Sequence, residues 1–100
     1  MPRLTLGFVT TEKLRKHFRD HKNEFGATTQ EQYEALADMF LGGPLGAGVR
    51  DCTRANGDYC RCNPSTGEYG ILDDSRHIIT FMILGHNTVA RRRQYFLDNC

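Results

Sequence analysis

The sequence predicts an α+β domain in which two N-terminal helices pack on a small antiparallel sheet of about four to five strands. Two observations support this prediction. Apolar side chains recur at helical spacing as far as residue 41, whereas residues 47–84 divide into short segments separated by turn residues. A chain of 100 residues is long enough for one small domain, which we assign to residues 1–100.

The first helix is expected at residues 11–25. Thr10 is a suitable N-cap, Glu12 places an acid in the first turn, and Gly26 stands where a left-handed C-cap glycine belongs. A second helix should follow the capping box that starts at Thr28, and the Gly-Gly-Pro run at residues 42–44 should end it. Its apolar positions follow the helical repeat and are Tyr33, Leu36, Ala37, Phe40 and Leu41.

The rest of the chain has the pattern of an antiparallel meander. Asn56-Gly57 is the strongest hairpin signal, and the turn residues at 64–67 and 73–76 predict two further tight connections. The expected strands are residues 49–53, 58–63, 68–72 and 77–84. Residues 89–97 fit a short helix or a fifth strand, and we favour the helix.

Charge is segregated along the chain, although the formal net charge is only +1. Residues 13–22 hold five cations and one Asp, and residues 91–93 form a second basic block. Local basic patches in a near-neutral chain favour an enzyme that binds phosphate at one site over a protein that coats nucleic acid. No apolar run approaches the roughly twenty residues of a membrane span, and residues 1–9 do not have the pattern of a signal peptide.

The four cysteines are Cys52, Cys60, Cys62 and Cys100. One residue separates Cys60 from Cys62, which is tighter than the spacing of about two to four residues in zinc sites. We therefore expect free, partly buried thiols and no metal site. The alternatives are structural zinc or a hairpin disulfide from Cys52 to Cys60 or Cys62.

The first helix carries residues suited to acid–base chemistry. Lys13, His17 and His21 are four residues apart and therefore share one side of the helix, beside an apolar seam. Imidazole titrates near neutral pH, where a general acid or base is most effective. The alternative is that His21 only borders the core and that the cations are a solvated face.

Three features then occur in the order seen in a known toxin family. They are the His-Phe-x-x-His-x-x-Glu-Phe-Gly helix at residues 17–26, the second helix ending in Phe40, and the hairpin at residues 63–70 that leads to Ile78-Ile79-Thr80-Phe81. Residues 14–81 thereby resemble C-terminal toxin domains of bacterial polymorphic and contact-dependent growth inhibition systems, in the barnase/EndoU/colicin/RelE (BECR) nuclease superfamily. The colicin D-like tRNA nucleases are the most similar group.

The resemblance implies a toxin ribonuclease that cleaves RNA, tRNA in particular, with no metal and no cofactor. The ribose 2′-OH would attack its own phosphate and leave a 2′,3′-cyclic phosphate. His21 would be the catalytic acid or base, Thr80 would contact the phosphate, and His17, Arg19 or Lys13 would assist. Which histidine is the acid and which the base stays open.

The same resemblance implies partners and a location. The toxin would be secreted or delivered by a producer cell and would act in the cytoplasm of the target cell. A cognate immunity protein, expected to be acidic, would protect the producer. A free toxin or a phage-encoded enzyme is an alternative within the nuclease class.

Further site residues are expected from their charge or aromatic character. Arg61 offers a planar donor fork to a phosphate and completes a catalytic set with His17, His21 and Thr80. The residues expected to hold the RNA strand are Lys13, Arg19, Lys22, Arg91 and Tyr95. His77 and His86 are expected in loops, with His86 the nearer to the cleft.

Two other functions compete with RNA cleavage. The first is a zinc protein that uses His17 and His21, although the zincin motif would need Glu where Phe18 stands. The second is a non-enzymatic module in which the basic helix binds RNA or a protein. Loss of the biological effect when His21 is replaced by alanine would argue against the second.

Overall fold

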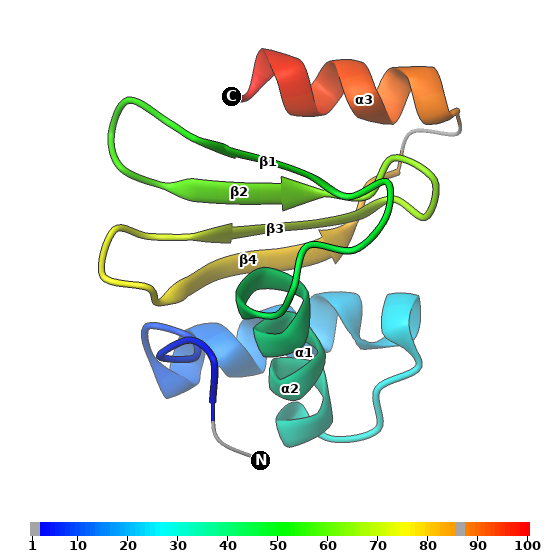
Figure 1. Cartoon of the computed structure of the whole chain (residues 1–100). Coiled ribbons are helices and arrows are strands. Elements are labelled where there is room, and N and C mark those ends of the chain that lie inside the picture. Colours follow the sequence, from blue (N-terminus) through cyan, green and yellow to red (C-terminus); the bar gives the residue numbers. More distant parts are fainter. Residues whose placement is uncertain (1–2, 86–87) are drawn as a thin grey trace.

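A computed structural model describes residues 3–85 and 88–100 of the chain. The elements, in chain order, are α1 (Thr11–Phe25), α2 (Gln30–Gly42), β1 (Arg50–Thr53), β2 (Tyr59–Cys62), β3 (Glu68–Leu72), β4 (Ile78–Ile83) and α3 (Val89–Asp98) (Figure 1). The strands form an antiparallel sheet in the order β1-β2-β3-β4. The predicted α+β fold is confirmed, and the tail is a helix. His86 lies outside the described residues.

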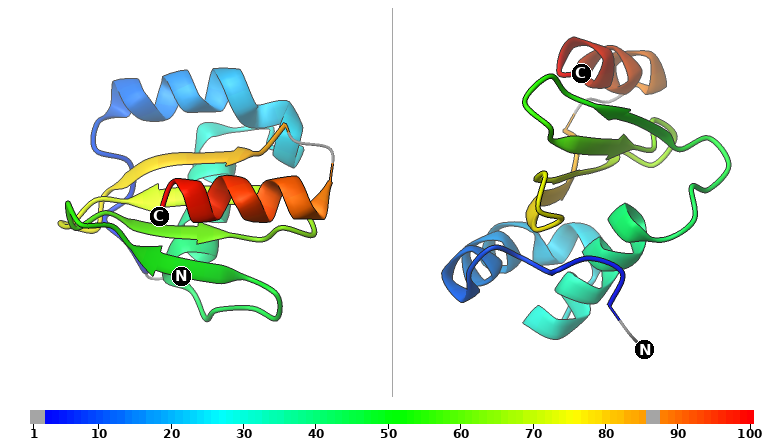
Figure 2. Two further views of the ribbon diagram at one scale, coloured as in Figure 1. Left: turned by 90° about the horizontal axis from the view of Figure 1, so that it is seen from above. Right: turned by 60° about the vertical axis from the view of Figure 1, so that its left-hand side comes forward.

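The sheet is covered on both faces. The helices α1 and α2 lie on one face and α3 lies on the other (Figure 1). Two hydrophobic clusters match this arrangement. The cluster on the α1/α2 face includes Phe8, Tyr33, Ala37, Leu41, Leu72, Ile78 and Phe81. The cluster on the α3 face includes Cys60, Cys62, Tyr69, Ile71, Leu84 and Phe96. Seen from above, α1 runs alongside the edge strand β4, and α2 crosses beneath the sheet (Figure 2).

Threonine caps begin all three helices. The hydroxyl oxygens of Thr10, Thr29 and Thr88 each accept a hydrogen bond from the backbone N–H three residues later. The cap of α2 is therefore one residue later than the expected Thr28. Gly26 has φ 64°, the left-handed conformation that ends α1, as its position predicts.

Residues 3–9 are an integral part of the fold. The Asp38 carboxylate accepts hydrogen bonds from the Leu4 and Thr5 N–H groups at 2.9 and 2.8 Å, which ties this segment to α2. Further along, the Ile78 N–H donates to the Gly7 carbonyl at 2.7 Å, and Phe8 forms a short parallel bridge with Ile78. This segment therefore brings the buried Phe8 ring against α1.

An irregularity interrupts the pairing of β3 with β4. Leu72 pairs with Ile78 and Ile71 pairs with Thr80, which leaves Ile79 as an extra residue. Ile78 packs in the cluster on the α1/α2 face, whereas Ile79 packs against the cluster on the α3 face. Simple alternation, which would place Ile79 and Phe81 on the same face, is therefore wrong here.

The cysteines differ from the sequence expectation in one respect. Cys60 and Cys62 are free and buried, as expected. Cys52 forms a disulfide with Cys100, with 6.3 Å between their Cα atoms. Cys60 is the direct cross-strand partner of Cys52, but α3 lies over this face and brings the C-terminal residue to β1. The alternative pairing of Cys52 with Cys60 or Cys62 is therefore wrong, as is the expectation of free thiols at Cys52 and Cys100.

Candidate active site

The packing of α1 against β4 places His17 and His21 next to each other. Their ring centroids are 5.9 Å apart and their planes are inclined by 24°. Both side chains are half-buried because they lie at the border of the apolar seam that faces β4. The helix thus brings together the two histidines that the sequence singles out.

Glu24 joins His21 to the sheet. Its Oε2 lies 2.7 Å from His21 Nδ1, and its Oε1 accepts a hydrogen bond from the Ile83 N–H, also at 2.7 Å. A carboxylate accepts hydrogen bonds, so this contact favours the tautomer with the proton on Nδ1. The other ring nitrogen, Nε2, is then left to act on a substrate. Sequence reasoning gave Glu24 no separate role, although its spacing of three residues from His21 is a helical contact distance.

The surroundings of His17 favour its neutral form. The centroid of its ring lies 5.4 Å from that of the Phe8 ring. Burial lowers the pKa of His17 below its ordinary value of 6.5, and the nearby His21 and Lys16 lower it further. A neutral imidazole at physiological pH is suited to accept a proton.

An aromatic cluster holds α1 in place beneath the histidines. The Phe25 and Phe81 rings stack with centroids 4.1 Å apart, and Tyr33 contacts both of them. The Tyr33 hydroxyl donates a hydrogen bond to the Phe81 carbonyl of β4. Tyr33 is fully buried, and this burial raises its pKa far above the ordinary range. Tyr33 therefore serves the packing of the site, as expected from its place on the apolar face of α2.

The basic residues of α1 are divided between its two edges. Lys13 precedes His17 by one turn and shares its side of the helix. Arg19 is two residues from both histidines, which corresponds to about 200° around the helix axis, and Lys22 lies about 140° from His17. Arg19 pairs with Asp20 at 3.3 Å, and the Lys22 Nζ lies 5.5 Å from the centroid of the Phe18 ring. Of the expected RNA-binding residues on α1, only Lys13 lies on the side of the histidines.

Arg61 is engaged in holding the end of α2. Its Nη1 donates to the carbonyl oxygens of Phe40 and Gly43 at 3.0 and 2.7 Å, and its Nε donates to the Tyr59 hydroxyl at 2.8 Å. Phe40 lies in the last turn of α2 and Gly43 is its C-cap, where backbone acceptors lack helical partners. The guanidinium therefore caps a helix, two strands away from β4.

The other expected site residues lie on the α3 face. The register pairs Thr80 with Ile71, whose side chain belongs to the cluster on that face. Arg91 is exposed on α3, and Tyr95 packs edge-on against Tyr69 at 5.4 Å between ring centroids. The structure thus separates Thr80, Arg91 and Tyr95 from the histidines by the thickness of the sheet.

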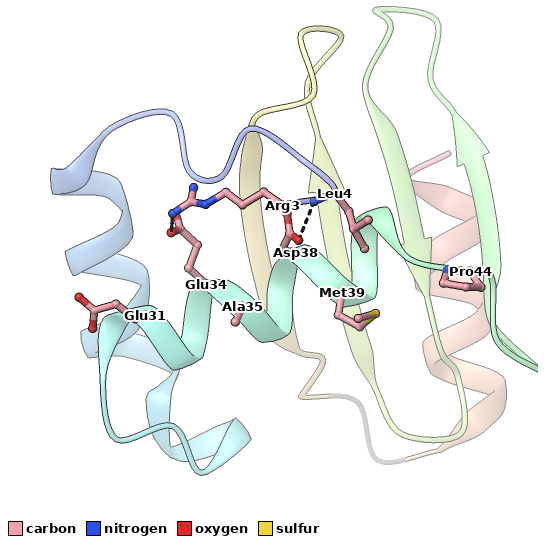
Figure 3. A pocket seen from close by; sticks show the side chains of 8 residues that line it. All are labelled: Arg3, Leu4, Glu31, Glu34, Ala35, Asp38, Met39 and Pro44. Carbon is pink, nitrogen blue, oxygen red and sulfur yellow. Dashed lines mark hydrogen bonds and ion pairs between the residues drawn. The ribbon is translucent and has the colours of Figure 1, made fainter. Parts of the chain in front are cut away.

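The larger cavity, of about 480 Å³, is not part of this site. Residues of α2, of the N-terminal segment and of the loop after α2 line it, and Figure 3 shows them. Its buried carboxylate, Glu34, pairs with Arg3 at 2.6 Å and accepts from the Phe8 N–H. Asp38 is bound by the N-terminal backbone, which lowers its pKa even though burial alone would raise it. Both carboxylates are therefore committed to fastening residues 3–9.

Within residues 3–85 and 88–100, no group of three or more His, Cys, Asp or Glu side chains is arranged to hold a metal ion. None of the helices in the same ranges is both long and apolar enough to cross a bilayer. In comparisons with known proteins, no family model matches the chain, and no curated protein is significantly similar to it.

Proposed function

We propose that this chain is a metal-independent endoribonuclease whose catalytic centre is formed by His17, His21 and Glu24. The observation that supports this proposal most is the joint placement of these groups. The two imidazole ring centroids lie 5.9 Å apart. The Glu24 carboxylate, which is hydrogen-bonded to the backbone of β4, orients the His21 ring. Two histidines in such a pair can act as base and acid in turn, which is what cleavage of RNA through its own 2′-OH requires.

The proposed reaction assigns a role to each histidine. His17, whose lowered pKa favours the neutral ring, takes the proton of the ribose 2′-OH. The 2′ oxygen then attacks the adjacent phosphorus, a 2′,3′-cyclic phosphate forms, and the bond to the 5′ oxygen breaks. His21 gives its Nε2 proton to that departing oxygen, while the Glu24 carboxylate holds the ring in place at Nδ1. Lys13 adds positive charge on the same side of α1.

The biological setting of the proposal comes from the resemblance to colicin D-like toxin domains. In that setting the substrate is tRNA, the enzyme is delivered into a target cell, and an immunity protein covers the basic helix. Thr80 has other surroundings than this resemblance implies, and Arg61, which was expected from its donor fork, binds the end of α2. The catalytic set that we propose therefore keeps His17 and His21, adds Glu24, and leaves out Thr80 and Arg61.

The decisive experiment is a cleavage assay with total cellular RNA in excess chelator. The parent chain is compared with His21→Ala, His17→Ala and, as a matched control, His77→Ala. We expect cleavage by the parent and by His77→Ala to give 2′,3′-cyclic phosphate ends. The two variants at the proposed centre should lose about 10²- to 10⁴-fold in rate. Cleavage that needs a metal ion, or that survives at full rate in both variants, would contradict the proposal.

A further inference from the structure

A second cavity, of about 330 Å³, lies at the junction of three segments: the start of β1, the turn between β2 and β3, and the first turns of α3. Arg50, Ser65, Val89 and Arg93 are among its lining residues. Of the described residues that line it, none is acidic. This cavity is separate from the larger one along α2 and shares no residue with the histidine centre.

The turn that forms one wall is held in a fixed position. Arg92 Nε donates to the Pro64 carbonyl at 2.5 Å, and Arg92 Nη2 donates to the Ser65 carbonyl at 3.3 Å. The Ser65 N–H in turn donates to Asn63 Oδ1 at 3.0 Å. Because Arg92 belongs to α3, these bonds keep the turn and the helix at a constant separation. The cavity is thus formed before any ligand arrives.

The two arginines that line this cavity have no acidic partner among the described residues. Arg50 comes from β1 and Arg93 from α3, and both are exposed. Neither guanidinium forms an ion pair or a side-chain hydrogen bond with any residue in 3–85 or 88–100. Two guanidiniums on different elements that face one polar cavity form a suitable site for a phosphate, which accepts paired hydrogen bonds from such groups.

The position of the cavity relates it to the histidine centre. The strand register places Arg50, Cys62, Tyr69 and Met82 in one row across the sheet. Ile83, which holds Glu24, follows Met82 directly. The cavity therefore lies at the end of the sheet where Glu24 is bound, and β1 is three strands from β4, roughly 14 Å at the usual spacing of about 4.8 Å. The cavity is on the α3 face, whereas the histidines are on the α1/α2 face, so an RNA strand that occupied both sites would pass around this end of the sheet.

We infer that the cavity between Arg50 and Arg93 binds a backbone phosphate of the RNA substrate, several nucleotides away from the phosphate that is cleaved and on the opposite face of the sheet. This inference rests on the proposed ribonuclease function and adds a binding subsite to it. The site reads the phosphate group and no base, so it contributes affinity and register without sequence preference.

The test uses the full chain carrying His21→Ala, so that bound RNA is not cut. Binding of a short fluorescein-labelled single-stranded oligoribonucleotide is followed by anisotropy over a series of KCl concentrations. Arg50→Gln and Arg93→Gln are introduced singly and together. Arg15→Gln is the matched control, because Arg15 is exposed on the edge of α1 about 200° from His17. In parallel, inorganic phosphate is titrated while the amide resonances of Ser65 and Val89 are recorded.

We expect the double variant to bind the oligonucleotide at least about tenfold more weakly and to reduce the slope of log affinity against log salt by about 0.7, the value for one phosphate. Arg15→Gln should change neither quantity appreciably. An unchanged affinity and slope in the double variant would overturn the inference, even if phosphate shifts the two amides, since the cavity would then take free phosphate only. A third outcome separates the two proposals. If the double variant loses RNA binding but the parent chain does not cleave RNA, the phosphate site is supported and the ribonuclease function is rejected.

Discussion

Glu24 Oε1 accepts a hydrogen bond from the Ile83 N–H at 2.7 Å, although 59 residues separate the two in the chain. The other oxygen of the same carboxylate lies 2.7 Å from His21 Nδ1. The orientation of the His21 ring therefore depends on the packing of α1 against the end of β4. A local helical motif becomes a candidate centre only when the sheet has formed.

Replacing Glu24 should impair catalysis more than stability. We expect Glu24→Ala to lower the rate of RNA cleavage by about 10- to 100-fold, less than the loss of a complete acid–base group. Glu24→Gln should be intermediate, because it retains one hydrogen-bonding oxygen. The thermal midpoint should fall only slightly, since the carboxylate is partly exposed. Single-turnover rates and thermal melts measure both quantities, and a Glu24→Ala variant with full activity would remove Glu24 from the centre.

The order of the helices and strands, and the proximity of His17 to His21 on α1, could be predicted from the sequence. Caps, turn residues and helical periodicity are local signals, and α1 and the meander follow them closely. The positions of Thr80 and Arg61 were not predictable in this way. An extra residue in β4 decides which face Thr80 occupies, and the carbonyls of a distant helix end decide what Arg61 binds. Both depend on contacts that form only in the complete fold.

The lowered pKa of His17 should make the stability of the chain depend on pH. When the pH falls below about 6.5, the unfolded imidazole takes up a proton before the folded one does, so folding loses free energy until the pH passes the folded pKa of His17. The contribution of neutral His17 to the free energy of unfolding is therefore fully present above about pH 6.5 and is lost as the pH falls. We expect His17→Gln to flatten this part of the curve of thermal midpoint against pH.

The control for this experiment is His77→Gln, which should leave that decline in place. His77 lies beside Asp73 and outside the aromatic cluster, so its replacement leaves the His17 ring packed against Phe8. Circular dichroism melts from about pH 8 to about pH 5 provide the comparison. A parent chain and a His17→Gln variant with parallel curves would contradict the prediction.

Arg61 should behave as a structural residue. Arg61→Ala removes the donors to Phe40 and Gly43 and should lower the free energy of unfolding by about 1–3 kcal/mol. Arg61→Lys should recover only part of this loss, because an ammonium group lacks the planar fork. Cleavage per folded molecule should remain close to that of the parent. Denaturant unfolding and rate measurements on the same preparations separate the two effects, and a large loss of rate with unchanged stability would place Arg61 in catalysis.

The hydroxyl of Tyr33 should contribute measurably to stability. Tyr33→Phe leaves the Phe81 carbonyl without its side-chain donor in a fully buried location, and we expect a loss of about 1–2 kcal/mol. Tyr59→Phe is a useful comparison. The Tyr59 hydroxyl donates to the exposed Asp51 and accepts from the half-buried Arg61, and because water can reach these partners, its removal should cost less. Urea unfolding curves test this order, and equal stability of Tyr33→Phe and the parent would refute it.

The Cys52–Cys100 disulfide should stabilise the chain substantially. It joins residues 48 positions apart, for which the loop-entropy relation gives about 4 kcal/mol, and measured values are commonly about 2–4 kcal/mol. Replacing both cysteines by serine should therefore lower the free energy of unfolding by about 2–4 kcal/mol. It should also weaken the attachment of the C-terminal end of α3 to β1. A single replacement is less informative, because it leaves a free thiol beside Cys60.

Thiol titration checks the same disulfide independently. Cys60 and Cys62 are almost completely buried, and burial raises the pKa of both thiols, so a thiol reagent should find almost no reactive group in the native chain. Unfolding without a reductant should expose these two thiols, and unfolding with a reductant should expose all four. Four reactive thiols in the absence of a reductant would show that Cys52 and Cys100 are not bonded. The serine variant would then have no reason to be less stable.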